Sequence, residues 1–359
     1  MPGPGTRDLP HAAPVRSSAI EPTGISFAGV PTPSLAGFLL RGFRGYSVRL
    51  AKSLVKAAIG RKPLFYAEDR FFLAYLRHRL GISRAGITCR LDDCPTEGGG
   101  SQALMMMIVI DFARTLGLDY FHSPFMAIQH ADRPQEAWLA AWEGLFNFGH
   151  GEVRADAANR EVFAATAINF DSIRSLFGEL RPYNNHDTHV IPQFSAASIG
   201  EFRRKYHANK SPRTNQRLTV CVHLRRFNRF DNNVDYVAPF SRVARTLAEV
   251  RTVLDAKGIE YAVHLFSQGH LSELPETLRN GVELHLDSDP IQSLEELVEA
   301  DVLLTSRGSF SYVAGLLCDG IVICEPFYPP QSNWLVCDDD GGIDAGRLTN
   351  RLNATLRVL

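Results

Sequence analysis

Short apolar runs separated by polar turns dominate the chain from residue 218 onward. Each run is bounded by turn-forming residues and is short enough to be a buried strand. Helical spacing of apolar residues lies between several of them, at 241–257 and 291–300. Strands that alternate with helices indicate an α/β fold with a parallel, Rossmann-like sheet. The predicted strands are 218–225, 261–266, 282–286, 302–304 and 321–323.

Residues 301–325 hold the most informative turn of this unit. An apolar run ends at Leu304, four polar or small residues follow, and a second apolar segment begins at Ser309. Gly320 ends that segment before the next strand. A small-residue turn that leads into a helix N-terminus is suited to anions, because free N–H groups and the helix dipole both favour negative charge there. Alternatively, Ser309 is only an N-cap and the turn binds nothing.

The first half of the chain also contains a strand, a turn of small residues and a helix in succession. A core helix is predicted at 67–80, then a strand at 85–91, a glycine-rich turn, a helix at 103–116 and a strand at 117–122. The turn matches neither a GxGxxG fingerprint nor a P-loop, so we interpret it as a pocket wall to which a ligand can come close. Its residues are Gly98, Gly99, Gly100, Ser101 and Gln102.

Aromatic and polar residues are dense between 122 and 152. Rings beside carboxylates and amides are suited to sugars, which indicates an acceptor side. The alternative is a core stripe, since Trp138 and Trp142 are spaced four residues apart on a helix. The acceptor-side candidates are His122, His130 and Asp132, although a single histidine can equally be a structural residue.

The remaining segments suggest how the chain is divided. Residues 41–62 are basic and interleaved with apolar residues, which fits either peripheral contact with an anionic membrane or an ordinary helix with a solvated face. Residues 170–180 are expected to be helical, and the basic stretch 201–217 to be a solvated interdomain linker. The terminal helix 343–359 is expected to pack against the first domain. The predicted parts are a disordered segment 1–35, an acceptor-side domain 36–214 with a basic helical leader, a nucleotide domain 215–340 and a C-terminal helix 341–359.

Composition narrows the class of protein. The chain has 359 residues, enough for two domains, with 45% hydrophobic and 21% charged residues. A formal net charge of −1 provides no general attraction for nucleic acid. The six cysteines form no CxxC pair, so buried free thiols are expected and a metal site is not. Because neither a membrane-spanning run nor a signal-peptide pattern is found, we expect a cytoplasmic protein.

The candidate chemistry gathers where the predicted strand 218–225 ends. His223, Arg225 and Arg226 occur at or just after this end, which is the carboxyl edge where open α/β sheets bind ligands. The guanidinium fork of arginine can bind a phosphate through two parallel hydrogen bonds. The alternative is that these arginines form salt bridges with neighbouring acids.

Two spaced motifs resemble the C-terminal half of the GDP-fucose-dependent fucosyltransferase superfamily, which includes α-1,2, α-1,6 and protein O-fucosyltransferases. The first is His223-Leu224-Arg225-Arg226, followed later by Phe266-Ser267. The second runs from Ala300 to Ser311 and contains Thr305, Ser306, Ser309 and Phe310. The resemblance covers roughly residues 215–330.

This resemblance implies a GT-B fold, in which two Rossmann-like domains face a cleft, and an inverting, metal-independent transfer of fucose from GDP-fucose to a glycan or polysaccharide. Arg225 matches the arginine that binds the donor β-phosphate, His223 the histidine beside it, and Ser309 the hydroxyl residue at the diphosphate. No separate cofactor is implied. The remaining donor-binding candidates are Arg226, Ser267, Thr305, Ser306 and Phe310.

At three places the sequence departs from the family pattern. Phe227-Asn228 follows the arginine pair, Gln268-Gly269 follows the 261–266 strand, and Ser293 stands where an acid is expected. Those acids help to hold the nucleoside and the sugar in the family. Transfer by direct displacement also needs a base for the acceptor proton. Asp235 is the catalytic candidate for that role, with Asp231, Asp132 and Glu152 as alternatives.

Three classes of function are therefore compared. The first is the glycosyltransferase. The second is a non-catalytic nucleotide-sugar or glycan-binding protein that kept the fold. The third is another nucleotide-handling enzyme, such as an epimerase or dehydrogenase, which is disfavoured because neither GxGxxG nor a suitably placed Tyr-x-x-x-Lys pair is present.

Overall fold

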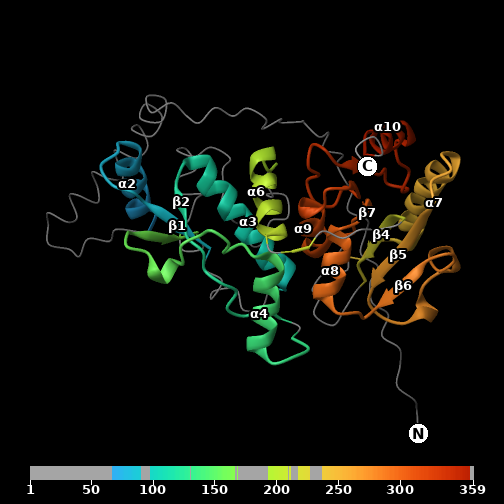
Figure 1. The fold of residues 1–359 in the computed structure, drawn as a ribbon, viewed down its shortest axis with the longest axis horizontal. Helices are drawn as coiled ribbons and strands as arrows, with labels where there is room; N and C mark the ends of the chain where they lie inside the picture. Colours follow the sequence, from blue (N-terminus) through green and yellow to red (C-terminus); the bar gives the residue numbers. More distant parts are fainter. Residues whose placement is uncertain are drawn as a thin grey trace, which may run out of the picture. The chain divides into compact units, whose positions relative to one another are not determined.

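In a computed structural model, the described residues are 67–89, 98–129, 131–165, 168, 193–208, 210–211, 217–226 and 237–355. Several predictions lie outside these residues: the segments 1–35 and 41–62, the helix 170–180, and the residues His130, Asp231 and Asp235. The described elements form two parallel β-sheets with helices packed against them (Figure 1). The predicted α/β class is therefore confirmed.

The first sheet has three short strands in the order β2-β1-β3, all parallel. The predicted helices at 67–80 and 103–116 and the strands around 87 and 120 are confirmed, whereas β3 was missed. Of the glycines expected to form a turn, Gly99 and Gly100 instead begin α3, and Gly98 is its N-cap. The elements are α2 (Ala67–Arg79), β1 (Gly86–Thr88), α3 (Gly99–Leu116), β2 (Asp119–Tyr120), α4 (Gln135–Phe146), a 3-10 turn (Ala155–Ala157), β3 (Val162–Ala164) and α6 (Ala196–His207).

The second sheet has six parallel strands in the order β6-β5-β4-β7-β8-β9. All the strands and helices predicted after residue 217 are present, and β9 is an additional strand. With β4 counted as strand 1, the order is 3-2-1-4-5-6, as in dinucleotide-binding folds. The elements are β4 (Leu218–Leu224), α7 (Phe240–Ala256), β5 (Tyr261–Ser267), 3-10 turns (Leu271–Glu273 and Glu276–Leu278), β6 (Glu283–Leu286), α8 (Pro290–Val298), β7 (Val302–Leu304), α9 (Ser309–Leu317), β8 (Ile321–Cys324), β9 (Leu335–Val336) and α10 (Ala345–Thr355).

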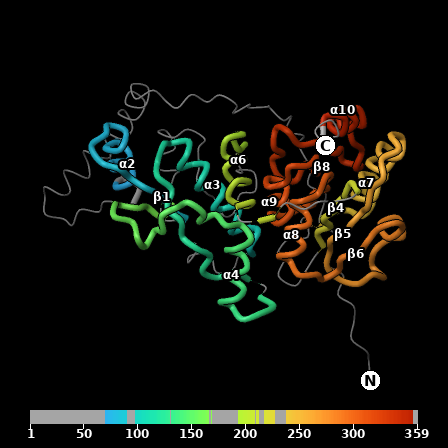
Figure 2. The backbone as a smooth tube through the Cα atoms, viewed as in Figure 1, coloured from blue at the N-terminus to red at the C-terminus, as the bar shows by residue number. Residues whose placement is uncertain are grey.

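Helix α9 packs against helices of both halves of the sequence. It contacts α8 of its own sheet and also α3 and α6 (Figure 2). One hydrophobic cluster accordingly contains Met106 and Phe202 together with Leu294, Val313 and Leu317. The two sheets are therefore joined by a shared apolar core, in which α9 is a central element.

The prediction of a solvated linker at 201–217 is wrong for the part of this basic stretch that the structure describes from residue 201 to 207. Its residues 201–207 belong to α6, where Lys205 and Tyr206 are fully buried. Arg203 donates hydrogen bonds to the carbonyl oxygens of Leu316 and Cys318 at the end of α9. Those carbonyls have no partner inside their own helix, so the arginine stabilises the α9 C-terminus.

Helix α10 corrects a second prediction. It packs on α7 and β8 of the second sheet rather than on the first half of the chain, with Leu348 and Leu352 fully buried there. Five cysteines are described, and all five are free and buried as expected. Burial raises the pKa of the Cys318 and Cys324 thiols to about 12. Among the described helices, none has the length and apolar character required to cross a membrane.

Candidate functional site

The order of the six-stranded sheet reverses between β4 and β7, and the most probable ligand position in such folds is the crevice outside the carboxyl ends of those two strands. Residues 223–226 end β4, and residues 305–310 lead from β7 into α9. We call these two segments the switch-point site. The backbone N–H of Arg225 donates to the Ser306 hydroxyl oxygen at 3.0 Å, so the two segments contact each other directly.

The turn before α9 is held by two buried serines. Ser306 donates its backbone N–H to the Ser311 hydroxyl oxygen at 3.1 Å, and that hydroxyl donates back to the Ser306 carbonyl at 3.1 Å. Gly308 follows with φ +127°, a conformation that residues with a Cβ rarely adopt. This arrangement fixes the direction in which the first turn of α9 presents its amides.

The N-cap residue of α9 is Gly308, which has no side chain to accept from the first amides of the helix. Ser309 is the first helical residue and is not the cap, so the simple N-cap interpretation is wrong. The leading N–H groups of an uncapped helix carry partial positive charge and favour an anion. An anion at this point would be bound by the backbone of Ser309 and Phe310.

The N-terminus of α3 lies against the N-terminus of α9. A Cβ at Gly100 would come within 2.7 Å of the Phe310 Cα, and a Cβ at Gly99 within 2.5 Å of the Trp142 ring. Helix α3 also begins without a side-chain cap, at Gly98. The glycines predicted as a pocket wall therefore allow close packing of two helix starts. Gln102 is buried and donates to the Ala127 carbonyl oxygen, while Ser101 is half-buried.

His223 lies beside this pair of helix starts. Its ring centroid is 5.3 Å from that of Phe310, which also makes an edge contact with Trp142. Burial, and secondarily the charge of Arg225, lowers the pKa of His223 to about 3. The ring is neutral at ordinary pH and acts as a hydrogen-bonding group rather than a cation. Its Nδ1 is shielded from solvent and has no hydrogen-bond partner in the part of the chain that the structure describes.

The other predicted donor-binding residues are engaged with protein groups. Arg226 forms an ion pair with Glu273 and donates to the Gln268 carbonyl oxygen at 2.7 Å, as the salt-bridge alternative anticipated. Ser267 donates to the Leu224 carbonyl oxygen at 2.9 Å, which ties the ends of β5 and β4 together. The backbone N–H of Thr305 donates to the Ile323 carbonyl oxygen at 2.9 Å. These residues shape the site around Arg225.

Sequence reasoning missed two acids near this edge. Asp287 directly follows β6, is exposed, and accepts from the Gly269 N–H at 3.2 Å. Glu325 follows β8, is buried, and accepts from Arg242 and Arg307 at 2.9 Å each. The signal that could have identified both is the position of an acid immediately after a strand. Arg307 is thereby directed to Glu325.

The two described acceptor-side candidates, His122 and Asp132, are engaged with neighbouring side chains. His122 is buried, lies 2.5 Å from a Glu143 carboxylate oxygen and contacts the Tyr120 hydroxyl at 3.4 Å. Asp132 is bound by Arg133, and this hydrogen bond lowers the pKa of the Asp132 carboxyl group, which weakens it as a base. Both Trp138 and Trp142 are buried, so the core-stripe alternative is confirmed for both rings.

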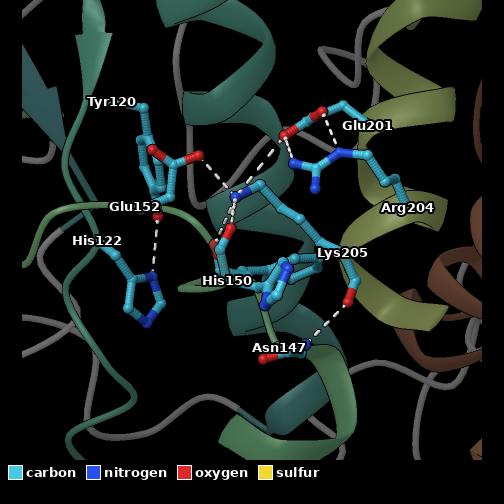
Figure 3. A network of polar contacts seen from close by, with 9 residues as sticks. Tyr120, His122, Asn147, His150, Glu152, Glu201, Arg204 and Lys205 are labelled. Carbon is cyan, nitrogen blue, oxygen red and sulfur yellow. Dashed lines mark hydrogen bonds and ion pairs between the residues drawn. The ribbon is translucent and has the colours of Figure 1, made fainter. Parts of the chain in front are cut away.

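A polar network lies in the first half of the chain (Figure 3). The fully buried Lys205 ammonium donates to Glu152 at 2.6 Å and to the carbonyl oxygens of Phe148 and His150. Glu201 accepts from Arg204 at 2.7 Å on the exposed side of α6. Glu152, an alternative base in the sequence analysis, is thus paired with a cation in this network.

A pocket of about 670 Å³ adjoins this network and is lined by both acids and arginines. It includes Ile110 and Arg114 of α3, whereas Gly100 of the same helix lies at the switch-point site. Ten helical residues span about 15 Å, so one small ligand cannot occupy both places. The charged lining residues are Arg84, Arg114, Arg160, Asp119, Glu152 and Glu201.

No protein-family model matches the sequence, and no curated protein matches it. Solved structures do match. POFUT1 in complex with GDP is 14% identical, with 66% of this chain and 95% of that chain covered and a TM-score of 0.32. The E. coli ADP-heptose LPS heptosyltransferase II is 12% identical, with 77% and 99% covered and a TM-score of 0.34. The iron-containing dodecameric glycosyltransferase TibC of E. coli is 13% identical, with 77% and 75% covered and a TM-score of 0.35.

Proposed function

We propose that this chain is a glycosyltransferase that uses a nucleoside-diphosphate sugar. The observation that carries the proposal is the switch-point site. There the backbone N–H of Arg225 donates a hydrogen bond to Ser306, in the turn that leads into the uncapped helix α9. Two motifs that resemble those of fucosyltransferases occupy this site, at residues 223–226 and 300–311. GDP-fucose is accordingly the proposed donor, and a glycan or polysaccharide hydroxyl the proposed acceptor.

In the proposed reaction the acceptor oxygen attacks the sugar anomeric carbon as the bond from that carbon to the diphosphate oxygen breaks. The acceptor proton passes to a base, for which Asp235 remains the candidate, and the configuration inverts. Negative charge grows on the departing diphosphate. The Arg225 guanidinium and the first α9 amides stabilise that charge, so the proposed reaction needs no metal at the donor.

His223 has a second role in the proposal. As a neutral ring with a shielded Nδ1, it offers one donor and one acceptor nitrogen at fixed positions. It therefore orients a donor hydroxyl or phosphate oxygen without adding charge. The contact of its ring with Phe310 couples its position to the first turn of α9.

The test is thermal stabilisation by GDP, UDP, CDP and ADP with metals chelated, for the wild type, Arg225→Ala and a matched control, Arg154→Ala. Arg154 is exposed and forms a local pair with Asp156. A ligand at 100 times its dissociation constant should add about 2.7 kcal/mol of stability. A GDP-selective shift lost only in Arg225→Ala supports the proposal.

Stabilisation by a different nucleotide would still support an enzyme that uses a nucleotide sugar, but it would contradict GDP-fucose as the donor. No shift with any nucleotide would contradict the proposed donor site. Where GDP binds, release of GDP from GDP-fucose in the presence of glycan acceptors separates an enzyme from a non-catalytic binding protein. A GDP-binding chain with neither hydrolysis nor transfer would contradict the proposed activity.

A further inference from the structure

A second cluster of chemically versatile side chains lies on the face of the β5–β6 strand pair that α8 covers. His264 is in register with Glu283, and Phe266 with His285. Side chains at these positions share one face of the sheet, because alternate residues point to the same side. On that face, the Sγ of Cys221 contacts the backbone oxygen of Glu296 in α8 at 3.5 Å.

The donor atoms of this cluster converge. The Nδ1 of His264 and the Nε2 of His285 are 3.1 Å apart. The Glu283 carboxylate faces both nitrogens, with Oε2 3.6 Å from His264 Nδ1 and Oε1 3.6 Å from His285 Nε2. One ligand atom each from His264, His285 and Glu296 lies within 4.8 Å of the others. Residues from two strands and one helix thus direct nitrogen and oxygen atoms toward one small volume.

A hydrogen bond between two neutral imidazoles accounts for the contact between the rings but not for the acids around them. Neither Glu283 nor Glu296 forms an ion pair with a lysine or arginine within the described ranges. Gln292 donates a hydrogen bond to Glu296 at 3.1 Å. This neutral amide orients the carboxylate but does not neutralise its charge. A divalent cation would neutralise both carboxylates.

The distances suit a transition-metal ion. Zinc binds histidine nitrogens at about 2.0–2.1 Å in tetrahedral geometry, which places two such nitrogens roughly 3.3–3.4 Å apart. The observed 3.1 Å is close to this value. The His285 ring is also held in place, because it stacks on the buried Phe266 with centroids 4.5 Å apart and an interplanar angle of 12°.

Access from solvent is retained. The side chains of His264 and His285 are 19% and 20% exposed, and β6 is the edge strand of its sheet. Glu283 is 66% exposed and can move toward an ion from the solvent side. The cluster is thus neither sealed in the core nor spread over an open surface.

We propose that His264, His285 and Glu296 bind one divalent transition-metal ion, Zn²⁺ by preference, and that Glu283 completes its coordination. Imidazole and carboxylate ligands suit zinc and its neighbours in the first transition row. The ion would fasten the β5–β6 edge to α8. It is a stabilising site, separate from the switch-point site, so sugar transfer does not depend on it. The expectation of no metal site rested on local Cys and His spacing, whereas these ligands come from three elements.

The test uses the full chain, stripped with EDTA and dialysed, and titrated with Co²⁺ alone. Visible absorption reports cobalt with nitrogen and oxygen ligands. The wild type is expected to bind one equivalent. His264→Gln, His285→Gln and Glu296→Gln are each expected to weaken binding at least about 10-fold. The matched control is His207→Gln, a change at a half-exposed histidine of α6 that has a single carboxylate nearby.

A second readout is thermal stability. Zn²⁺ is expected to raise the Tm of the wild type and of the control variant, but not of the three ligand variants, whose Tm in EDTA should equal that of the wild type in EDTA. The proposal is overturned if the wild type binds less than stoichiometric Co²⁺. It is equally overturned if the three ligand variants bind Co²⁺ as tightly as the control. The wild-type titration alone can refute the proposal, so the proposal stays testable even if one of the variants fails to fold.

Discussion

Gly100 and Phe310 bring the starts of two helices together: a Cβ at position 100 would lie 2.7 Å from the Phe310 Cα and 3.0 Å from its nitrogen. The obstructing atoms are backbone, so they cannot rotate away as a side chain could. The contact joins the first turn of α3 to the first turn of α9, where the proposed diphosphate binds.

Gly100→Ala should therefore destabilise the fold and weaken nucleotide binding. Overpacking of this kind costs about 1–3 kcal/mol. Gly144→Ala is the matched control, because Gly144 is an exposed residue of α4 with nothing near its missing Cβ. The control should be neutral or stabilising, by up to about 1 kcal/mol of helix propensity. Urea unfolding and GDP titration measure both effects, and equal midpoints for the two variants would refute the packing argument.

Lys205→Met should cost much more than its position in a basic stretch suggests. The change leaves Glu152 and two carbonyl oxygens without their buried cation. Breaking a buried pair by removing one partner costs about 3–5 kcal/mol. Arg204→Met, one residue earlier, removes only an exposed pair with Glu201 and should cost about 0.2–1 kcal/mol. Chemical denaturation of both variants gives the comparison, and similar losses would mean that the buried ammonium contributes little.

Arg203→Ala tests the stabilisation of α9 at its other end. The guanidinium donates to the carbonyl oxygens of Leu316 and Cys318 and pairs with Asp319. Loss of a charged partner at a helix C-terminus should lower the free energy of unfolding by about 1–2 kcal/mol. Amide hydrogen exchange should accelerate in α9 first. If exchange rises equally in α7, the effect is global and the local argument fails.

His223 predicts how stability changes with pH. The folded-state pKa is about 3, below the ordinary value of 6.5, so the unfolded chain takes up a proton that the folded chain excludes. This group's contribution is constant above pH 6.5 and is lost progressively as pH falls from 6.5 toward 3. His223→Gln should remove up to about 1.4 kcal/mol per pH unit of that slope. Denaturation at pH 7, 6, 5 and 4 measures it, and parallel curves for wild type and variant would refute the shift.

The strands after residue 217 could be predicted because each is a compact apolar run that ends in turn residues, and burial on both faces of a parallel sheet requires that pattern. The position of residues 223–226 and 305–310 at one edge of the sheet could be predicted for the same reason, since the ends of β4 and β7 are read directly from the sequence. Helix α6 was misread because its basic residues suggested solvent. Lys205 and Arg203 are instead satisfied by carbonyl oxygens of distant elements, and no local pattern reveals such partners.

Short strands and long-range ligands escaped prediction for a related reason. The missed strands β3 and β9 have three and two residues, too few for an alternation to be recognised. The cluster of His264, His285 and Glu296 has no spacing motif, because the register of β5 with β6 and the position of α8 bring it together. Contacts between residues that are far apart in the sequence leave no local pattern, so they were found only in the structure.

The position of α9 also bears on how the protein can be divided. Its sequence belongs to the second sheet, yet one end packs on α3 and the other is stabilised by Arg203 of α6. A fragment that begins at residue 217 would leave Val313, Leu316 and Leu317 without the apolar partners of the shared core. We therefore expect the second half, when expressed alone, to aggregate or to remain only partly folded. The boundary visible in the sequence separates two sheets but not two autonomous folding units.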